Sequence, residues 1–325
     1  QGIECLRHAI ADYVNLERGA HATAERVLVL TSSQQAMSLC AQLLLDVGDA
    51  IFIEDPLYHG ARKAFDAAGL NCIPIPVDQD GISVDQLRQS PHAAKAVFLT
   101  PSHQFPTGVT LSLDRRLAMI EWASQQQAWI IEDDYDSEFR LTGKPIPSLQ
   151  SMDITQKVIY INTFTKSLSS TMRISYMVLP PKLANRFLER LSFYSCTVSN
   201  FEQYALMRFI NEGCFEKHIN RMRNFYHKQR DSLLDAIKNS PLASYVTIME
   251  EDSGLHFLLK VNTELSDEEL MQRALQKGVK LNSLSAYYHD SPDDFAAHTF
   301  IINYSYLNTT GVEDAIKVLY DVIKK

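Results

Sequence analysis

One lysine near the middle of the chain is set among hydroxyl side chains and is followed by an arginine. Lys166 lies in the stretch TFTKS (residues 163–167), and Arg173 follows seven residues later. A lysine amine can condense with an aldehyde, and the hydroxyls of Thr163 and Thr165 with a bidentate Arg173 suit a phosphate dianion. Pyridoxal phosphate carries both groups. The segment predicts a pyridoxal phosphate site, with a surface lysine after a buried strand as the alternative.

An acidic segment ends an apolar run 33 residues before this lysine, in the sequence WIIEDDY (residues 129–135). Open α/β sheets place their ligands where such strands end. The cofactor withdraws electrons only if its ring nitrogen stays protonated, and a carboxylate partner secures that. We therefore expect Asp133 at the ring nitrogen and Tyr135 as a donor to the ring hydroxyl. A solvated acidic loop is the alternative.

A second strand-to-helix junction offers backbone groups for the phosphate. The run VLVL (residues 27–30) leads into small hydroxyl residues and then into a helical pattern. The free N–H groups at a helix N-terminus bind phosphate, which makes Ser33 and the Gln34 amide candidates. An ordinary serine helix cap fits the same stretch equally well.

Two further side chains are candidates for the cofactor pocket. Tyr58 follows the strand pattern at residues 50–53 and could stack on the pyridine ring, although a core tyrosine is the more frequent case. His103 is a candidate for the pocket wall, with a hydrogen-bonded structural histidine as the alternative.

Two longer motifs carry a family resemblance that extends over nearly the whole chain. They read TPSHQFPTG (residues 100–108) and IEDDYDSEF (residues 131–139). The chain resembles the fold-type I pyridoxal phosphate enzymes of the class I aminotransferase branch. Within that branch it looks like the MocR subfamily of GntR-type bacterial transcription regulators. Those proteins fuse an N-terminal winged helix-turn-helix to an aminotransferase-like domain that senses an effector.

The resemblance implies a role for each candidate. Lys166 would bond the cofactor aldehyde, Asp133 would meet the ring nitrogen, and Tyr135 would meet the ring hydroxyl. The remaining implied contacts are the phosphate group for Arg173, Thr163, Ser33 and Gln34, and the ring face for Tyr58. Ordinary aminotransferases carry an asparagine before Pro-Thr-Gly that touches the ring hydroxyl, whereas this chain has Phe105.

A second departure concerns the arginine that holds the substrate carboxylate in class I aminotransferases. It stands on a strand near the C-terminus, where the matching position here is about Tyr306, and no arginine follows Arg273. Gly60 occupies a second position at which a γ-aminobutyrate-responsive relative has arginine. We therefore expect an effector that is not held as a simple amino-acid carboxylate. A neutral group, another contact or pyridoxal phosphate itself remains open.

Composition favours an intracellular ligand-binding body. The 325 residues are 46% hydrophobic, enough for a large core and about two domains. No apolar run approaches a membrane span of about 18 residues, and the five scattered cysteines indicate reduced thiols in the cytoplasm. DNA binding needs a concentrated basic surface. The net charge is −8, and the densest basic stretch (residues 217–230) has the pattern of an exposed helix face. We therefore do not expect this chain to bind DNA by itself.

Alternating strand and helix patterns predict an α/β fold, a mostly parallel sheet with helices on both faces. We expect a large cofactor domain over residues 1–210 and a smaller α+β domain over 211–325. Two long helices are predicted at 182–212 and 214–239. Residues 281–298 are expected to form an irregular loop near the ligand pocket.

The helical pattern that begins at residue 3 starts abruptly. We expect the chain to be a fragment of a longer regulator, with a DNA-binding domain upstream, and to form a homodimer as the resemblance implies.

Two function classes follow from the sequence, and a third is weaker. The chain is a pyridoxal phosphate sensing domain with little or no turnover, or it is a working aminotransferase or lyase. The missing arginine and Phe105 favour sensing, while the intact lysine, aspartate and phosphate set allows catalysis. A relic without cofactor is disfavoured, because a buried lysine and aspartate without a ligand would carry an uncompensated desolvation cost.

Overall fold

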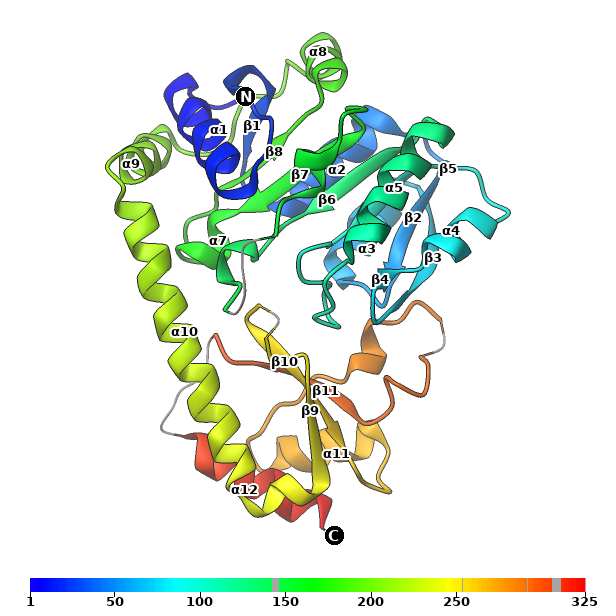
Figure 1. Ribbon diagram of the computed structural model, residues 1–325, viewed down its shortest axis with the longest axis vertical. Coiled ribbons are helices and arrows are strands. Elements are labelled where there is room, and N and C mark those ends of the chain that lie inside the picture. Colours follow the sequence, from blue (N-terminus) through cyan, green and yellow to red (C-terminus); the bar gives the residue numbers. More distant parts are fainter. Residues whose placement is uncertain (142–145, 253, 291, 306–310, 325) are drawn as a thin grey trace.

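Two sheets of different size organise the chain. The computed structural model describes residues 1–141, 146–252, 254–290, 292–305 and 311–324. The large sheet has the strand order β1-β8-β7-β6-β5-β2-β3-β4, and the small sheet has the order β11-β10-β9. Figure 1 shows the large sheet and its helices above the small sheet, with α10 (Cys214–Lys238) along one side of both.

The large sheet is parallel through its centre. Strands β3, β2, β5, β6 and β7 pair in parallel, β8 runs antiparallel to β7 and β1, and β4 runs antiparallel to β3. The strands are β1 Val27–Leu30, β2 Ala50–Asp55, β3 Asn71–Asp78, β4 Gly81–Ile82, β5 Ala94–Leu99, β6 Trp129–Asp133, β7 Val158–Thr163 and β8 Ser175–Val178. The expected mostly parallel α/β architecture is confirmed.

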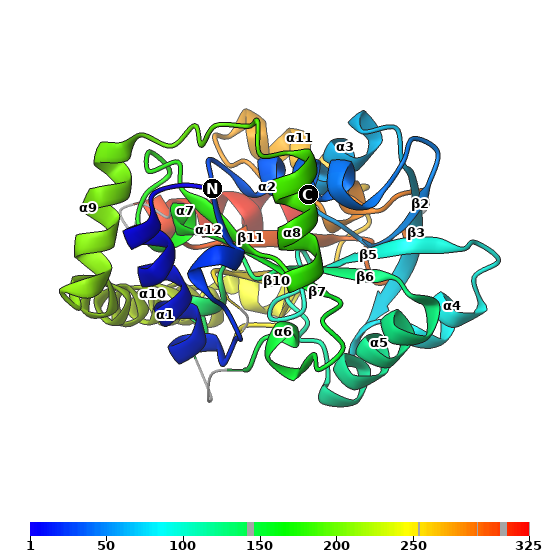
Figure 2. The ribbon, with the colours of Figure 1, turned by 90° about the horizontal axis from the view of Figure 1, so that it is seen from above.

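Alternating side chains bury both faces of this sheet. Ile51 and Ile53 of β2 pack with α2, α3 and α8, whereas Phe52 packs with α4 and α5 on the other face. Figure 2 shows α2 and α3 on one side and α5 and α6 on the other. These helices are α2 Ser33–Leu44, α3 His59–Ala67, α4 Val84–Gln89, α5 Leu113–Gln126, α6 Leu149–Met152 and α8 Pro181–Arg190.

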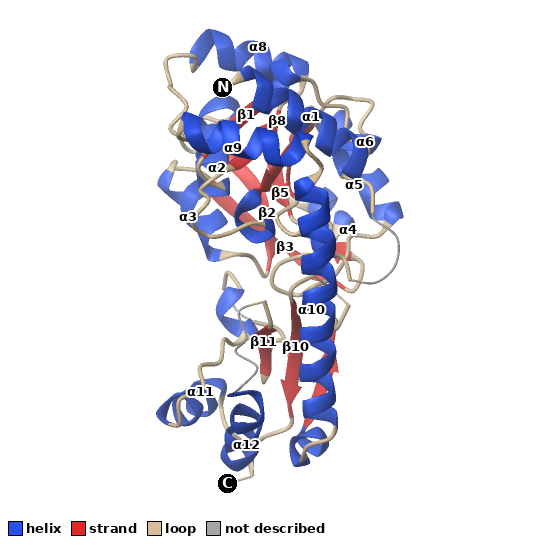
Figure 3. Cartoon of the chain, turned by 90° about the vertical axis from the view of Figure 1, so that its left-hand side faces the viewer, coloured by secondary structure: helices blue, strands red, loops and turns tan. Residues whose placement is uncertain are grey.

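The small sheet packs against the C-terminal helices and α10. Its strands are β9 Val246–Met249, β10 His256–Val261 and β11 Thr299–Asn303, with α11 Asp267–Gln276, α12 Val312–Ile323 and the short turns η3 Pro241–Tyr245 and η4 Leu284–Tyr287. One apolar cluster joins this part to α1 (Glu4–Arg18) through α10. The predicted boundary at residues 210 and 211 falls just before this connecting helix (Figure 3), and it remains a prediction.

The predicted helix over 182–212 is wrong in one respect, because it is two helices. Pro181–Arg190 and Asn200–Asn211 (α9) flank a non-helical stretch that contains the sequence SFYSCTVS (residues 192–199). Serine and threonine side chains compete for backbone hydrogen bonds, and β-branched residues lose rotamer freedom in a helix. The second predicted helix, over 214–239, matches α10, and the apolar run at 27–30 matches β1. None of the described helices is long and apolar enough to cross a lipid bilayer.

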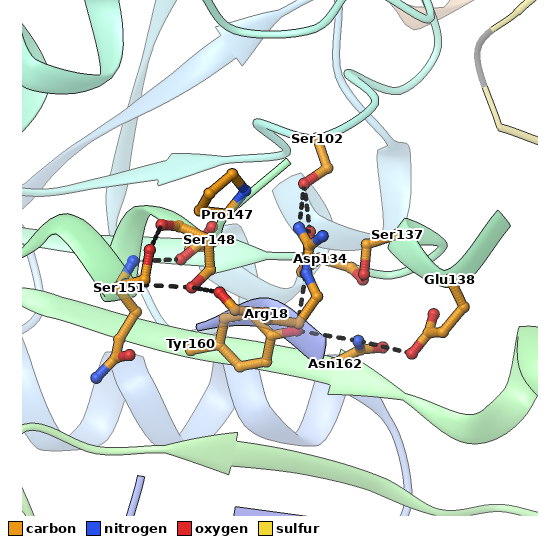
Figure 4. Close-up of polar contacts among 12 residues, drawn as sticks. Arg18, Ser102, Asp134, Ser137, Glu138, Pro147, Ser148, Ser151, Tyr160 and Asn162 are labelled. Atoms are coloured by element: carbon orange, nitrogen blue, oxygen red, sulfur yellow. Dashed lines mark hydrogen bonds and ion pairs between the residues drawn. The ribbon is translucent and has the colours of Figure 1, made fainter. Parts of the chain in front are cut away.

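A buried ion pair fastens α1 to the edge where the strands end. Arg18 Nε donates to Asp134 Oδ2 at 2.8 Å, and its Nη2 donates to Asp134 Oδ1 at 3.1 Å. Ser102 and Tyr160 donate to the same carboxylate at 2.5 and 2.7 Å. Figure 4 shows this arrangement, in which one carboxylate joins residues from four separate segments.

We predict that Arg18→Ala strongly destabilises the protein. The substitution leaves Asp134 buried without its cation, which costs about 3–5 kcal/mol. The matched control is Arg208→Ala, which removes an arginine paired with Glu212 on the surface, at a cost of about 1 kcal/mol or less. Urea unfolding of the two variants measures both values. Equal losses would contradict a central role for the Arg18 pair.

Candidate functional site

A cavity of about 330 Å³ opens where the central strands of the large sheet end. Ligands bind at this carboxyl edge in open α/β sheets. Its described lining residues are Ser32, Ser33, Gln34, Tyr58, Phe98, Thr100, Phe105, Asp133, Tyr135, Thr163, Thr165, Lys166 and Arg173. The fold thus brings together side chains from residues 32 to 173.

Nine of the ten candidate residues from the sequence lie in this lining. His103 does not belong to it. Its side chain is 2% exposed, and its Nδ1 lies 2.9 Å from Asp136 Oδ1, an arrangement typical of a structural histidine. Ser32, Phe98 and Thr100 also line the cavity and were not predicted from the sequence. The position of Thr100 directly after β5, like that of the acids that end β6, was a usable signal.

Asp133 is a buried acid without a neutralising partner. Its Oδ1 is buried and has no hydrogen-bond partner among the described residues. Burial, with the nearby charges of Asp134, Asp136 and Glu54, raises the pKa of Asp133 to about 8. A protonated ring nitrogen facing this carboxyl would supply the missing donor and the missing positive charge.

The hydroxyl of Tyr135 is the second orphan group in the cavity. It is buried without a partner in the described part of the chain. Burial, together with Asp136 and Asp133, raises the pKa of Tyr135 well above its ordinary value, so the phenol stays neutral and can donate. The two orphan groups match the ring nitrogen and the ring hydroxyl of pyridoxal phosphate, so this end of the cavity fits the cofactor.

The opposite end of the cavity suits a phosphate. Thr163 caps the one-turn helix α7 (Phe164–Ser167), and its Oγ1 accepts from the Ser175 hydroxyl at 2.9 Å and from the Thr165 N–H at 3.2 Å. Across the cavity, Ser32 caps α2 by accepting from the Gln35 N–H. The N–H groups of Ser33 and Gln34 stand in the first turn of α2, where no intrahelical acceptor exists.

Aromatic rings close the mouth of the cavity. The Phe105 ring meets Tyr58 and Tyr287 edge to face, with centroids 6.1 and 5.4 Å apart. Tyr287 stacks on His59 at 4.8 Å, and the Tyr287 carbonyl accepts from the Leu57 N–H at 3.0 Å. Tyr287 belongs to the segment 281–298, which contains the 3-10 turn η4. This segment contacts the lining residue Phe105, but it contributes none of the described lining residues.

The chain belongs to the class I and II aminotransferases. That family matches residues 1–295. The chain is 39% identical to the HTH-type transcriptional regulator YdeL of Bacillus subtilis, covering 97% of this chain and 66% of that protein. It is 36% identical to the probable rhizopine catabolism regulatory protein MocR of Rhizobium meliloti, covering 97% of this chain and 62% of that one. The predicted resemblance to MocR-type regulators is confirmed.

Solved structures agree on the fold. A kynurenine aminotransferase from Pyrococcus horikoshii, crystallised with PMP, superimposes with a TM-score of 0.86 at 29% identity, covering 99% of this chain and 80% of that one. Family membership and the orphan donor and acceptor groups together indicate pyridoxal phosphate as the cofactor. When bound, this group supplies an aldehyde that reacts with amines and a ring that withdraws electrons.

We predict that Lys166 is the residue that bonds the cofactor. The purified protein should be yellow, and borohydride should fix the cofactor to the peptide that contains Lys166. Lys166→Ala should abolish the visible absorption band, because no other amine lines the described cavity. Lys95→Ala, which removes a surface lysine paired with Asp49, should keep the band. A Lys166→Ala protein with an unchanged band would refute the assignment.

We predict opposite effects of Asp133→Asn with and without cofactor. Without cofactor, the folded-state pKa of about 8 lies above the ordinary value of 3.8. The native acid therefore holds its proton where the unfolded acid has lost it, so stability falls as pH rises between these values. The asparagine variant escapes this loss, and its relative stability should grow by up to about 1.4 kcal/mol per pH unit.

With pyridoxal phosphate bound, the order should reverse. The carboxylate then meets a charged ring nitrogen, and losing that hydrogen bond costs about 1.5–3 kcal/mol. Urea midpoints at pH 5, 6.5 and 8, with and without cofactor, measure both effects. If the stabilities of the two cofactor-free proteins change with pH in parallel, Asp133 does not have the raised pKa.

Proposed function

We propose that this chain is the effector-sensing, pyridoxal phosphate-binding domain of a bacterial MocR-type transcription regulator. Its similarity to two regulators extends over 97% of the chain, which spans 66% and 62% of their lengths. DNA would be bound by a winged helix-turn-helix elsewhere in the full protein, since this acidic chain carries a net charge of −8. The regulator would work in the cytoplasm as a homodimer.

The observation that carries this proposal is the set of cations around the cavity. The described lining contains only two, Lys166 and Arg173. The cofactor aldehyde and phosphate would engage both, which leaves no lining cation for the carboxylate of an amino-acid substrate. No arginine follows Arg273 in the sequence, and the matching position near Tyr306 lies outside the described residues.

The second arginine position of the γ-aminobutyrate-responsive relative holds Gly60. The Tyr58 ring lies where a side chain at position 60 would begin, so a larger residue there would displace that ring. Phe105 has no polar group that could contact the ring hydroxyl of the cofactor. Tyr135 is then the one lining residue that we assign to this hydroxyl as a donor. Phe105 thus presents an aromatic surface where ordinary aminotransferases have a polar asparagine.

These features limit turnover more than binding. Catalysis requires the substrate α-carbon to be held beside Lys166, which must move the proton once it is displaced from the cofactor. Without a carboxylate clamp this alignment would be poorly defined, whereas the cavity would still admit amines beside Lys166. The effector would be an amino compound or pyridoxal phosphate itself. Its binding would shift the large and small sheets relative to each other and pass the change to the DNA-binding domain.

An active class I aminotransferase is the alternative function. It is favoured by the complete set of Lys166, Asp133 and Arg173 at one cavity. The two functions predict different steady-state rates of transamination, because an aminotransferase must turn over fully between an amino acid and a keto acid.

We predict negligible steady-state transamination by the cofactor-loaded protein. A panel of amino acids and keto acids should give only slow half-reactions, visible as changes in cofactor absorbance, because the substrate carboxylate is not clamped. Cofactor loading is checked by absorbance before each assay, so that inactivity cannot reflect apo-protein. A rate near the ordinary enzyme median of about 10 per second for any pair would establish the aminotransferase instead.

A further inference from the structure

A second cavity, of about 240 Å³, shares no lining residue with the cofactor site. It opens where α1, the short turn η2 (Ser137–Phe139) and the connecting helix α10 meet. Its lining residues are Tyr13, Glu17, Arg18, Ser137, Glu138, Arg140 and Arg223. The proposed function assigns no role to this cavity.

Two polar atoms of this lining are buried and have no hydrogen-bond partner in the described part of the chain. Glu138 is 6% exposed, and its Oε2 has no hydrogen-bond partner among the described residues. Its other oxygen accepts from Asn162 at 3.2 Å and from the Tyr13 hydroxyl at 3.4 Å. Arg140 Nε is likewise buried without an acceptor. Native structures satisfy nearly all such groups, so an acceptor and a donor left open at one cavity call for a ligand or water.

The lining of the cavity carries charges of both signs. Arg18 forms an ion pair with Asp134. Neither Arg140 nor Arg223 forms an ion pair with a described acid. Arg223 Nε donates a hydrogen bond to the Glu138 carbonyl oxygen. Burial raises the pKa of Glu138 to about 7, as expected for a carboxyl that lacks a cationic partner. The cavity therefore offers the guanidinium groups of Arg140 and Arg223 to an anion, and the carboxylates of Glu138 and Glu17 to a cation.

We propose that this cavity binds a small zwitterion, such as a free amino acid, with its ammonium group at Glu138 and its carboxylate at Arg140 and Arg223. A purely anionic ligand would leave Glu138 unsatisfied, and a simple amine would leave the guanidinium groups unsatisfied. A ligand with both charges satisfies the open acceptor and the open donor together.

The site is connected to the cofactor cavity by hydrogen bonds. Asn162 donates both to Glu138 and to the Tyr160 hydroxyl, at 3.2 and 3.1 Å, and Tyr160 donates to Asp134 (Figure 4). Asn162 Oδ1 also accepts from the N–H of Thr163, which lines the cofactor cavity. A zwitterion at Glu138 would thus act on the strand that leads into the lysine loop, and on α10 through Arg223.

The test is calorimetric titration of holo-protein whose cofactor has been fixed by borohydride, so that amines cannot react at the cofactor. The probes are L-alanine, propionate and propylamine, which share a three-carbon skeleton and differ in charge. Alanine should bind at least about tenfold more tightly than either singly charged probe. Absence of saturable alanine binding would overturn the proposal. Propionate binding as tightly as alanine would also overturn it, in favour of a simple anion site.

Variants locate the binding. Arg140→Gln and Glu138→Gln should each weaken alanine binding by about tenfold or more, whereas Arg208→Gln, at a surface arginine of α9, should leave it within about twofold. Arg140 is only partly buried, so its variant is expected to fold, and circular dichroism checks this. If Glu138→Gln fails to fold, Arg140→Gln decides alone. Unchanged alanine affinity in a folded Arg140→Gln protein would overturn the assigned site.

Discussion

The contrast between two adjacent carboxylates organises the functional half of this molecule. Asp134 is bound by Arg18, Ser102 and Tyr160. Although burial alone would raise the pKa of Asp134, Arg18 and these hydrogen bonds lower it, so the group stays ionised. Its neighbour Asp133 receives no such help, and burial beside this fixed negative charge raises its pKa to about 8. The fold thereby holds one acid that lacks only a cation, at the place where a cofactor ring would sit.

The rest of the cavity follows from strand topology. Parallel strands end at one edge, so short segments after β1, β5, β6 and β7 converge there with hydroxyls, Lys166 and Arg173. The same edge carries aromatic rings at the mouth, centred on Phe105. Among the described lining residues, a complete cofactor set stands without any cation beyond Lys166 and Arg173, and this is the physical basis for favouring sensing over turnover. Helix α10, which runs along both sheets, is the natural element to carry a change in their relative position (Figure 3).

Local sequence patterns predicted much of this arrangement, and long-range contacts account for what they missed. The β-branched strand runs and the hydroxyl-flanked Lys166 are visible within short windows, and they located the sheet and most of the lining. The partner of Asp134 lies 116 residues upstream, at Arg18, so no local window could explain why Asp133 rather than Asp134 is left unpaired. His103 was equally ambiguous, since its bond to Asp136 forms only on folding. In the sequence, Glu138 is only one residue of a longer motif. Its unpaired acceptor could not be predicted, because its surroundings are formed by α1 and α10, which are distant in the sequence.

The central claim is that the described residues of the cofactor site provide no clamp for a ligand carboxylate. The most direct measurement is a titration of the holo-protein's visible absorption with L-phenylalanine and with 2-phenylethylamine, which differ only in the carboxylate. An arginine clamp would contribute about 1.5–3 kcal/mol to binding of the amino acid. Our account predicts that the amine half-saturates the cofactor signal at the same concentration as the amino acid, or at a lower one. Amino-acid binding that is about tenfold or more tighter would contradict the account.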